Sequence, residues 1–224
     1  MSESRPILAV VGMTREAKIL EGESVVVGGG DAAGLAARLE ELLSRGCAGV
    51  ISFGLCGALD PALKVGDIVV GAAVTGQEGA FQTDPDWASH LCSAIPGATL
   101  TGFAQAENPV AAAEEKAELR RVTGAGAVDL ESYLVGRLAR WFGVPFAVLR
   151  AVSDDASRTL PHAARVGLGK DGRPAIGPVL ASLGSNPWQI GSLIRTALEA
   201  EDGFHALERA RHLLGPGLGR PDLG

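Results

Sequence analysis

The sequence predicts an α/β protein with one domain, built around a central sheet that helices cover on both faces. Three observations support this fold class. The chain has 224 residues, of which 46 % are hydrophobic and 21 % charged, so it can bury one sizeable core. Short β-branched runs alternate with Ala- and Leu-rich segments at helical spacing. The predicted strands are mostly continuous apolar runs, which is typical of strands buried on both sides.

The elements follow one another along the chain without an internal repeat or a low-complexity linker. Strands are predicted at residues 7–11, 25–27, 50–53, 68–74, 99–104, 128 and 146–152. Helices are predicted at residues 32–43, 111–121 and 132–142, and Gly46 and Gly143 follow two of them as natural stops. A loop-like stretch at 160–174 precedes two further helices at 187–200 and 202–214. We therefore expect a single domain over 1–224, with a core at about 6–158 and a C-terminal extension at about 160–215.

Composition excludes several classes of function. The 26 acidic and 20 basic residues give a net charge of -6, which argues against a general nucleic-acid binder. Three cysteines without CxxC spacing suggest neither a disulfide framework nor a zinc site. The apolar opening is too short for a signal peptide, and the uncharged stretches 87–106 and 174–194 contain Pro, Gly and an amide side chain. We expect a cytoplasmic protein without a membrane-spanning helix.

A Gly-Gly-Gly-Asp run at residues 28–31 lies between a predicted strand and a predicted helix. Backbone N–H groups at such a junction can hold an anion or the polar edge of a ligand. The run matches neither the dinucleotide-binding nor the P-loop pattern. The alternative is a tight turn with Asp31 as the helix N-cap. Candidate residues for a phosphate or water site are therefore Gly28, Gly29 and Gly30, with Arg15 or Arg38 as a distant cation.

Four segments at residues 10–20, 51–70, 127–132 and 144–154 together resemble the nucleoside phosphorylase and nucleosidase superfamily. The second segment contains the pattern Leu-x-Pro-x-Leu-x-x-Gly-Asp, and the fourth ends in Arg-x-Val-Ser-Asp. The resemblance implies a three-layer αβα fold around a mixed, largely parallel twisted sheet. It also implies cleavage of the N-glycosidic bond of a nucleoside by a homodimer or higher homo-oligomer. No metal or organic cofactor is implied, although inorganic phosphate is an alternative co-substrate to water.

A narrower resemblance, to the hopanoid-associated phosphorylase branch, is carried by residues 28–31, 52–57, 128–132, 154–161 and 210–218. This branch implies adenosylhopane, a lipid-linked nucleoside, as the substrate and adenine as the released base. Two enzyme alternatives remain: a methylthioadenosine/adenosylhomocysteine or futalosine-type nucleosidase, and a general purine nucleoside phosphorylase. A nucleoside-binding sensor without turnover is the alternative outside the enzymes.

The chemistry of purine release assigns roles to two acidic residues. The departing base must gain a proton at N7, and the sugar develops oxocarbenium character. Asp154 ends an apolar strand, where burial favours a protonated acid that can serve the base; the alternative is a turn or helix cap. The neighbouring Asp155 competes, and the motif register selects Asp154. Glu131 offers two oxygens to the 2′- and 3′-hydroxyls of ribose, unless it is only an acidic residue in a helix's first turn.

Other site residues follow from the resemblance alone. It implies that the Leu130 backbone lies against the sugar and that further substrate contacts come from Ser153, Gly54, Leu55 and Gly57. Glu16 falls where hydrolytic nucleosidases carry the Glu that orients or deprotonates water; the alternative is a solvated helix residue. The loop at 53–55 has no Arg where phosphate-using relatives often place one, which favours water as the nucleophile.

The C-terminal region suggests the size of the substrate. An apolar set would border a greasy 5′-substituent, or else form core or a dimer interface: Ile176, Val179, Leu180, Leu183, Trp188, Ile190, Leu193 and Ile194. Four arginines would face lipid headgroups in a peripheral membrane contact at the inner face of the membrane, or else lie on a solvated helix face: Arg195, Arg209, Arg211 and Arg220.

Overall fold

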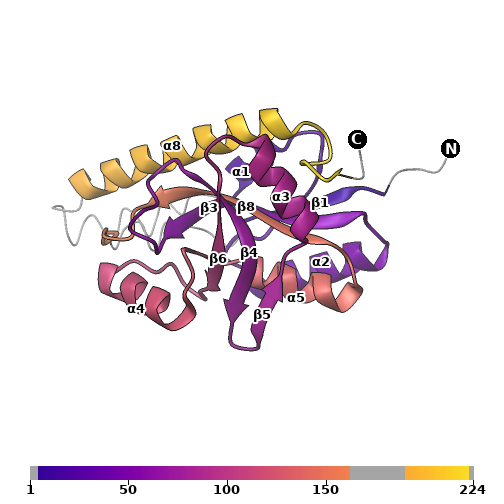
Figure 1. The fold of residues 1–224 in the computed structure, drawn as a ribbon, viewed down its shortest axis with the longest axis horizontal. Coiled ribbons are helices and arrows are strands. Elements are labelled where there is room, and N and C mark those ends of the chain that lie inside the picture. Colours follow the sequence, from indigo (N-terminus) through magenta and orange to yellow (C-terminus); the bar gives the residue numbers. More distant parts are fainter. Residues whose placement is uncertain (1–4, 162–189, 222–224) are drawn as a thin grey trace.

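The computed structural model describes residues 5–161 and 190–221 (Figure 1). These residues contain an eight-stranded sheet with the strands β1 (Ile7–Val11), β2 (Ser24–Val27), β3 (Gly49–Ala58), β4 (Ile68–Gly76), β5 (Gly79–Gln82), β6 (Thr99–Gln105), β7 (Ala127–Asp129) and β8 (Phe146–Asp154). The helices of the same residues are α1 (Thr14–Ile19), α2 (Ala32–Ser44), α3 (Pro85–Ala94), α4 (Ala113–Thr123), α5 (Ser132–Phe142) and α8 (Ile190–Leu214).

The sheet is mixed and largely parallel, as predicted. Its order is β2-β1-β3-β7-β6-β4-β5, and β8 pairs with both β3 and β4. Within the described residues the pairs β1–β2, β1–β3, β3–β8, β4–β6 and β6–β7 are parallel, whereas β3–β7, β4–β5 and β4–β8 are antiparallel. Following the pairs from β3 through β8, β4, β6 and β7 leads back to β3. The sheet therefore closes on itself as a five-strand ring, which the sequence did not predict.

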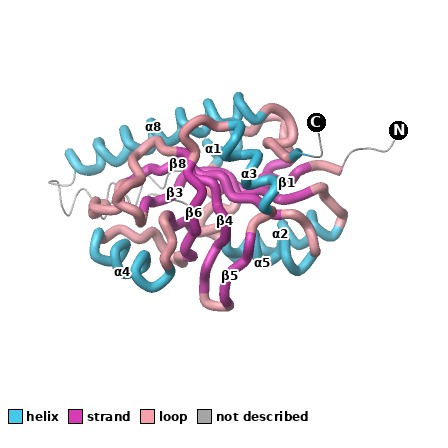
Figure 2. Tube along the Cα trace, viewed as in Figure 1, coloured by secondary structure: helices cyan, strands magenta, loops and turns pink. Residues whose placement is uncertain are grey.

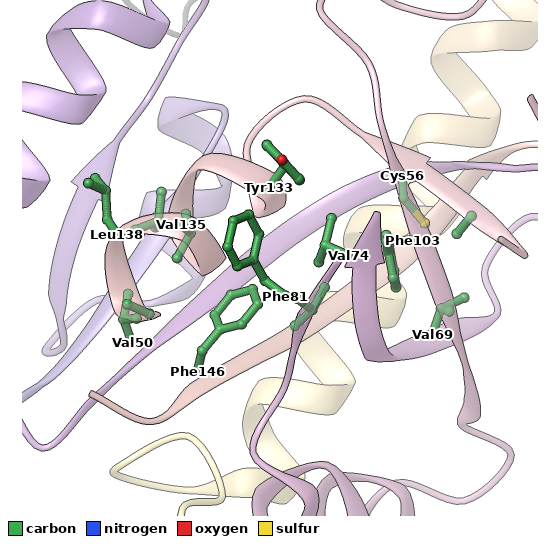
Figure 3. Packing of buried hydrophobic residues seen from close by; sticks show 14 of the residues in the cluster. Val50, Cys56, Val69, Val74, Phe81, Phe103, Tyr133, Val135, Leu138 and Phe146 are labelled. Carbon is green, nitrogen blue, oxygen red and sulfur yellow. The ribbon is translucent and has the colours of Figure 1, made fainter. Parts of the chain in front are cut away.

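Helices cover the sheet on two faces, giving the predicted three layers (Figures 1 and 2). In β1, Leu8 and Val10 pack toward α2 and α5, while Ile7, Ala9 and Val11 pack toward α1, α3 and α8. This alternation follows from the two-residue period of a strand. Figure 3 shows the hydrophobic cluster on the side of α2 and α5, to which Phe81 and Tyr133 belong. The centroids of these two rings lie 5.0 Å apart. Both faces of the inner strands are therefore buried, which explains their unbroken apolar sequences.

Several elements were not predicted from the sequence. The short helix α1, the helix α3 and the hairpin strand β5 were missed, and β3 is ten residues long where four were expected. Helix α3 has a clear start signal, because Asp84 accepts a hydrogen bond from the Trp87 N–H at 2.9 Å and Pro85 follows the cap. Strand β5 is paired only with β4 and has only one buried residue, so its hydrophobic pattern is weak.

The predicted break between two C-terminal helices is wrong: α8 runs unbroken from Ile190 to Leu214. Gly203 allows the helix to pack closely against Leu55, because a Cβ at this position would lie 2.7 Å from Leu55 Cδ2. The predicted start of that helix at 187 and most of the 160–174 loop lie outside the described residues. So do five of the apolar positions, at 176, 179, 180, 183 and 188. No helix among the described residues is long and apolar enough to cross a membrane.

Candidate active site

A cavity of about 250 Å³ opens at the edge of the sheet where β1, β3 and β8 present their carboxyl ends. Ligand sites in parallel sheets commonly lie at this edge. Its lining brings together seven predicted site residues: Glu16, Leu55, Gly57, Leu130, Glu131, Ser153 and Asp154. The remaining lining residues are Gly12, Met13, Cys56, Ala106, Pro109, Val110, Val128, Asp129, Arg150 and Leu160.

Arg150, to which the sequence analysis gave no role, occupies the centre of this wall. The guanidinium is 1 % exposed and comes from β8. Its Nη2 donates to Ser52 Oγ at 2.6 Å and to Glu131 Oε2 at 3.1 Å. Its Nε lies 2.8 Å from Asp129 Oδ2 as an ion pair that is not aligned as a hydrogen bond. Arg150 therefore fixes the orientation of Glu131, whose side chain caps no backbone N–H of α5 although it stands at the N-cap.

The site is rich in negative charge. Burial lowers the pKa of Arg150, but Asp129, Glu131 and Glu16 outweigh burial and raise it above its ordinary value. The pKa of Glu131 is raised to about 7, mainly by burial and also by the neighbouring Asp129 and Glu16, against the opposing effect of Arg150. Three carboxyl groups thus share one guanidinium, and Glu131 holds a proton for part of the time near neutral pH.

Glu16 is not the solvated helix residue that its sequence position alone suggested, because it is 1 % exposed. Its Oε2 accepts a hydrogen bond from the Met13 N–H at 2.7 Å, and its Oε1 accepts one from the Leu55 N–H at 2.8 Å. Burial raises the pKa of Glu16 above its usual value, against the opposing effects of Arg150 and these backbone donors. The carboxylate is thereby clamped between α1 and β3 inside the cavity.

Gly54 makes this clamp possible, and Gly54→Ala is expected to damage it. A Cβ at Gly54 would lie 2.4 Å from Glu16 Oε1 and 2.8 Å from Arg150 Nη1, at a φ of +151°. Gly79, with a φ of +108° and no atom within 4 Å of its Cβ position, is the matched control for backbone strain alone. We expect the Gly54 variant to lose about 2 kcal/mol more unfolding free energy than Gly79→Ala in urea titrations. Equal losses would contradict the proposed close packing.

A β-bulge brings two neighbouring residues to the cavity. Cys56 pairs with Val152 and Gly57 with Asp154, so Ser153 is an extra residue in β8. Bulges re-aim side chains, and here Ser153 and Asp154 both line the cavity. Asp155 does not line it. The Ser153 Oγ lies 2.9 Å from Asp154 Oδ1 and 3.1 Å from the Cys56 carbonyl oxygen.

Asp154, predicted to serve the departing base as an acid, lies against a buried lysine. Lys116 Nζ lies 2.5 Å from Asp154 Oδ2, and both side chains are buried. The sequence analysis assigned Lys116 no role.

The predicted glycine site lies beside this cavity rather than in it. Gly29 and Gly30 line an adjoining cavity of about 580 Å³ that also reaches Leu130 and Glu131. A Cβ on Gly28 would lie 3.5 Å from Glu131 Cγ, and Asp31 caps α2 by accepting from the Gly34 N–H at 3.0 Å. The run therefore makes the predicted N-capped turn and also borders the site.

Neither arginine suggested as a phosphate ligand lies in these two cavities. Arg15 pairs with Glu201 and stacks 4.1 Å over the Phe204 ring, while Arg38 donates to the Val27 carbonyl at 3.0 Å. Both guanidinium groups have partners outside the cavity walls, so the structure lends no support to either as a phosphate ligand.

The four C-terminal arginines differ in their surroundings. Arg195 pairs with Glu199 on its own helix, and Arg211 pairs with Glu23 at 2.7 Å. Arg220 lies 5.9 Å over the Trp87 ring, and Arg209 is exposed. Three of the four thus contact partners within the chain, which favours a structural role over a headgroup-binding face.

The missed residues carried signals that were available in the sequence. Arg150 interrupts the otherwise apolar run of residues 146–152, and a charge inside a strand buried on both faces must be paired. Lys116 shares one face of α4 with Ala112, Leu119 and Thr123, so it is the charged residue on the helix's covered stripe. Ser52 and Ser132, which hydrogen-bond to each other at 2.9 Å, gave no signal that distinguishes them from ordinary strand and helix residues.

The family model for the phosphorylase superfamily matches residues 9–176, three quarters of the chain. The chain belongs to the phosphorylase superfamily.

Individual relatives agree with this assignment. A 5′-methylthioadenosine/S-adenosylhomocysteine nucleosidase of Marinomonas sp. (strain MWYL1) is 29 % identical over 50 % of this chain and 59 % of its own length. The futalosine hydrolase of Helicobacter pylori superposes with a TM-score of 0.68 at 15 % identity, covering 96 % of this chain and 98 % of that one. The nucleosidase of Colwellia psychrerythraea in complex with adenine gives 0.59 at 18 % identity, covering 90 % and 96 %. The two structures establish the shared fold.

Proposed function

We propose that the protein hydrolyses the N-glycosidic bond of an adenosine-type nucleoside and releases adenine. The observation that carries the proposal is the convergence of Glu16, Glu131 and Asp154 on one cavity. In this cavity the guanidinium of Arg150 is already engaged by Asp129 and Glu131. A phosphate dianion would meet several carboxylates there and no uncommitted cation among the described lining residues, which favours water as the nucleophile.

The residues support a dissociative displacement. As the C1′–N9 bond breaks, its electron pair moves to the purine and Asp154 delivers a proton to N7. Glu131 accepts hydrogen bonds from the 2′- and 3′-hydroxyls, and its charge stabilises the cationic sugar. Glu16 orients a water molecule, takes its proton and allows the C1′–O bond to form. Arg150 keeps Glu131 in place throughout, and no step calls for a metal or organic cofactor.

The finer substrate assignment rests on sequence. Residues 28–31, 52–57, 128–132 and 154–161 resemble the branch that acts on adenosylhopane, so we propose this lipid-linked nucleoside as the natural substrate. The named activities of the relatives, on methylthioadenosine, adenosylhomocysteine and futalosine, define the alternatives. All share a purine ribonucleoside-type core whose 5′-position carries the variable group.

The deciding experiment measures base release from adenosylhopane, methylthioadenosine and inosine, each with and without phosphate. We expect adenine release without phosphate, with adenosylhopane giving the highest kcat/KM. A phosphorylated sugar product would replace water by phosphate as the nucleophile. Binding of adenine nucleosides with no base release from any of them would identify a sensor and overturn the enzymatic function.

Acid pH is expected to lower kcat/KM with a midpoint near 7. Glu131 accepts two hydroxyl hydrogen bonds only when ionised, and its pKa is raised to about 7 by burial. Its protonated fraction therefore grows as the pH falls through this value, and substrate binding weakens. The measurement is kcat/KM from pH 5 to 9 for the wild type. A profile that stays flat down to pH 5 would show that Glu131 does not titrate in this range.

We also propose a cytoplasmic homo-oligomer that needs no metal. The free thiols of Cys47, Cys56 and Cys92 suit a reducing compartment. Light scattering of the purified protein gives its assembly state, and dialysis against a chelator is expected to leave base release unchanged.

A further inference from the structure

A buried lysine faces the residue to which we assign base protonation. Lys116 has no exposed surface and is the buried residue of α4, a helix whose other side chains are exposed or half-buried. Its Nζ lies 2.5 Å from Asp154 Oδ2 and 2.6 Å from the Asp155 carbonyl oxygen. A buried ammonium is unfavourable unless it is paired and hydrogen-bonded, and both partners here come from the end of β8.

A purely structural lysine is a poor explanation for this arrangement. Leu, Met or Ala on the covered stripe of α4 would anchor the helix without removing an ion from water. The ion pair instead joins α4 to a carboxylate oxygen of Asp154, a residue that lines the cavity. Lys116 therefore acts on the same carboxyl group that must move a proton during base departure.

We propose that Lys116 is a positioning residue for Asp154, holding its carboxylate in place and supplying the proton that Asp154 passes to N7 of the departing purine. The inference rests on the proposed nucleoside cleavage. Lys116 acts through Asp154 and does not itself line the cavity.

When the C1′–N9 bond breaks, the purine takes the electron pair and becomes basic at N7. The Lys116 ammonium gives a proton to the ionised carboxylate of Asp154, and the carboxyl group passes a proton on to N7. Asp154 ends as the carboxylate it was at the start, and Lys116 is left as a neutral amine. Solvent reprotonates the amine after adenine leaves. A free acid is therefore not required at Asp154 in the resting enzyme.

Ser153 fits both protonation states of Asp154. With an ionised carboxylate, the Ser153 hydroxyl donates to Asp154 Oδ1 at 2.9 Å. When Oδ2 carries the proton from Lys116, the hydroxyl can keep this hydrogen bond to Oδ1 or turn to the Cys56 carbonyl oxygen at 3.1 Å. Rotation of one hydroxyl hydrogen is the only change that Ser153 needs to make.

The charged and titratable groups around the pair come from four elements. They are Glu115 beside Lys116 on α4, Arg150 and Asp155 on and after β8, Asp129 on β7 and the Cys56 thiol on β3. Asp129 and Arg150 are engaged with each other. Burial raises the pKa of Cys56 well above its usual value, so the thiol stays protonated. Lys116 thus remains the cation in direct contact with Asp154 among the described residues.

The first test compares Lys116→Met with Lys116→Arg and with Lys18→Met, which makes the same change at an exposed lysine of α1. Loss of the ammonium leaves Asp154 to hold its own proton, so kcat at pH 8 is expected to fall about 100-fold with KM nearly unchanged. The alkaline decline of kcat should move at least one pH unit lower, and Lys116→Arg should not restore it, because a guanidinium keeps the positive charge but does not release a proton. A uniform loss of kcat at every pH would overturn the proposal in favour of a structural role.

A second measurement does not depend on turnover or on the stability of a variant. In wild-type protein with ¹³C-labelled aspartate carboxyl groups, the Asp154 signal is assigned by its absence in Asp154→Asn. We expect the chemical shift of an ionised carboxylate at pH 7, as the ion pair requires; a protonated shift would overturn the proposal. If the wild type releases no base from any nucleoside, the proposed function fails, while this signal still tests whether Asp154 is the anionic partner of Lys116.

Discussion

Arg150→Met is expected to lower the free energy of unfolding by about 3–5 kcal/mol, because it leaves a buried carboxylate cluster without its cation. Glu16, Asp129 and Glu131 are each less than 10 % exposed and lie around the guanidinium. The backbone N–H groups on Glu16 and the hydroxyl of Ser132 on Asp129 remain, but neither supplies a positive charge.

Urea unfolding of the variant and the wild type measures this loss. Arg45→Met is the matched control, since Arg45 forms an exposed ion pair with Glu41 and its removal should cost under about 1 kcal/mol. Combining Arg150→Met with Glu131→Gln should recover part of the loss, because one buried charge is removed with its partner. A loss below 1 kcal/mol would show that protons, rather than Arg150, neutralise the cluster.

The pH dependence of that loss has a definite sign. The pKa of Glu131 in the folded protein, about 7, lies above its ordinary value of 4.5, so folding takes up a proton between these values. The contribution of this group to stability is present below about 4.5 and is lost as the pH rises through 7. Without Arg150 to oppose the effect, the variant should lose stability more steeply over this window than the wild type.

Asp154→Asn is expected to reduce kcat for adenine release by about 10²–10⁴, the usual contribution of a general acid. The amide has nearly the same shape as the carboxyl group but cannot pass a proton to N7. It also leaves the Lys116 ammonium without its anionic partner, so the folded state should be checked by thermal unfolding.

Asp155→Asn is the matched control for this prediction. The two aspartates are adjacent, yet only Asp154 lines the cavity, while Asp155 contacts Lys116 through its backbone carbonyl, which the substitution retains. We expect the Asp155 variant to keep kcat within about threefold of the wild type. If both variants lose activity equally, the bulge at Ser153 does not separate the two side chains as described.

Local sequence signals predicted the elements that depend on local interactions. Helix α5 begins and ends where predicted, at Ser132 and Phe142, because its apolar stripe is strong and Gly143 ends it with a φ of +65°. The inner strands were found from their apolar runs. The extension of β3 and the continuity of α8 depend instead on partners far away in the sequence, such as β8 against β3 and Leu55 against Gly203.

The candidate site also has features that local sequence predicted and features that depend on distant residues. Motif order predicted that Glu16, Glu131 and Asp154 belong together, and the fold does place them around one cavity. Burial of Glu16 is set by β3, whose Leu55 N–H reaches it across 39 positions, and a six-residue helix carries no pattern that reveals this. The Lys116–Asp154 contact likewise joins segments 38 residues apart.

The closed ring of strands constrains how the protein folds during synthesis on the ribosome. Strand β8, which contributes Arg150 and Asp154, is the last strand of the described chain, and it fills the place between β3 and β4. A nascent chain that stops before residue 146 would therefore leave one edge of β3 and one edge of β4 unpaired. It would also lack Arg150, the cation that neutralises the buried carboxylates of the cavity. The sheet closes and the residues that line the cavity come together in the same step, so a chain that ends before β8 lacks this cavity.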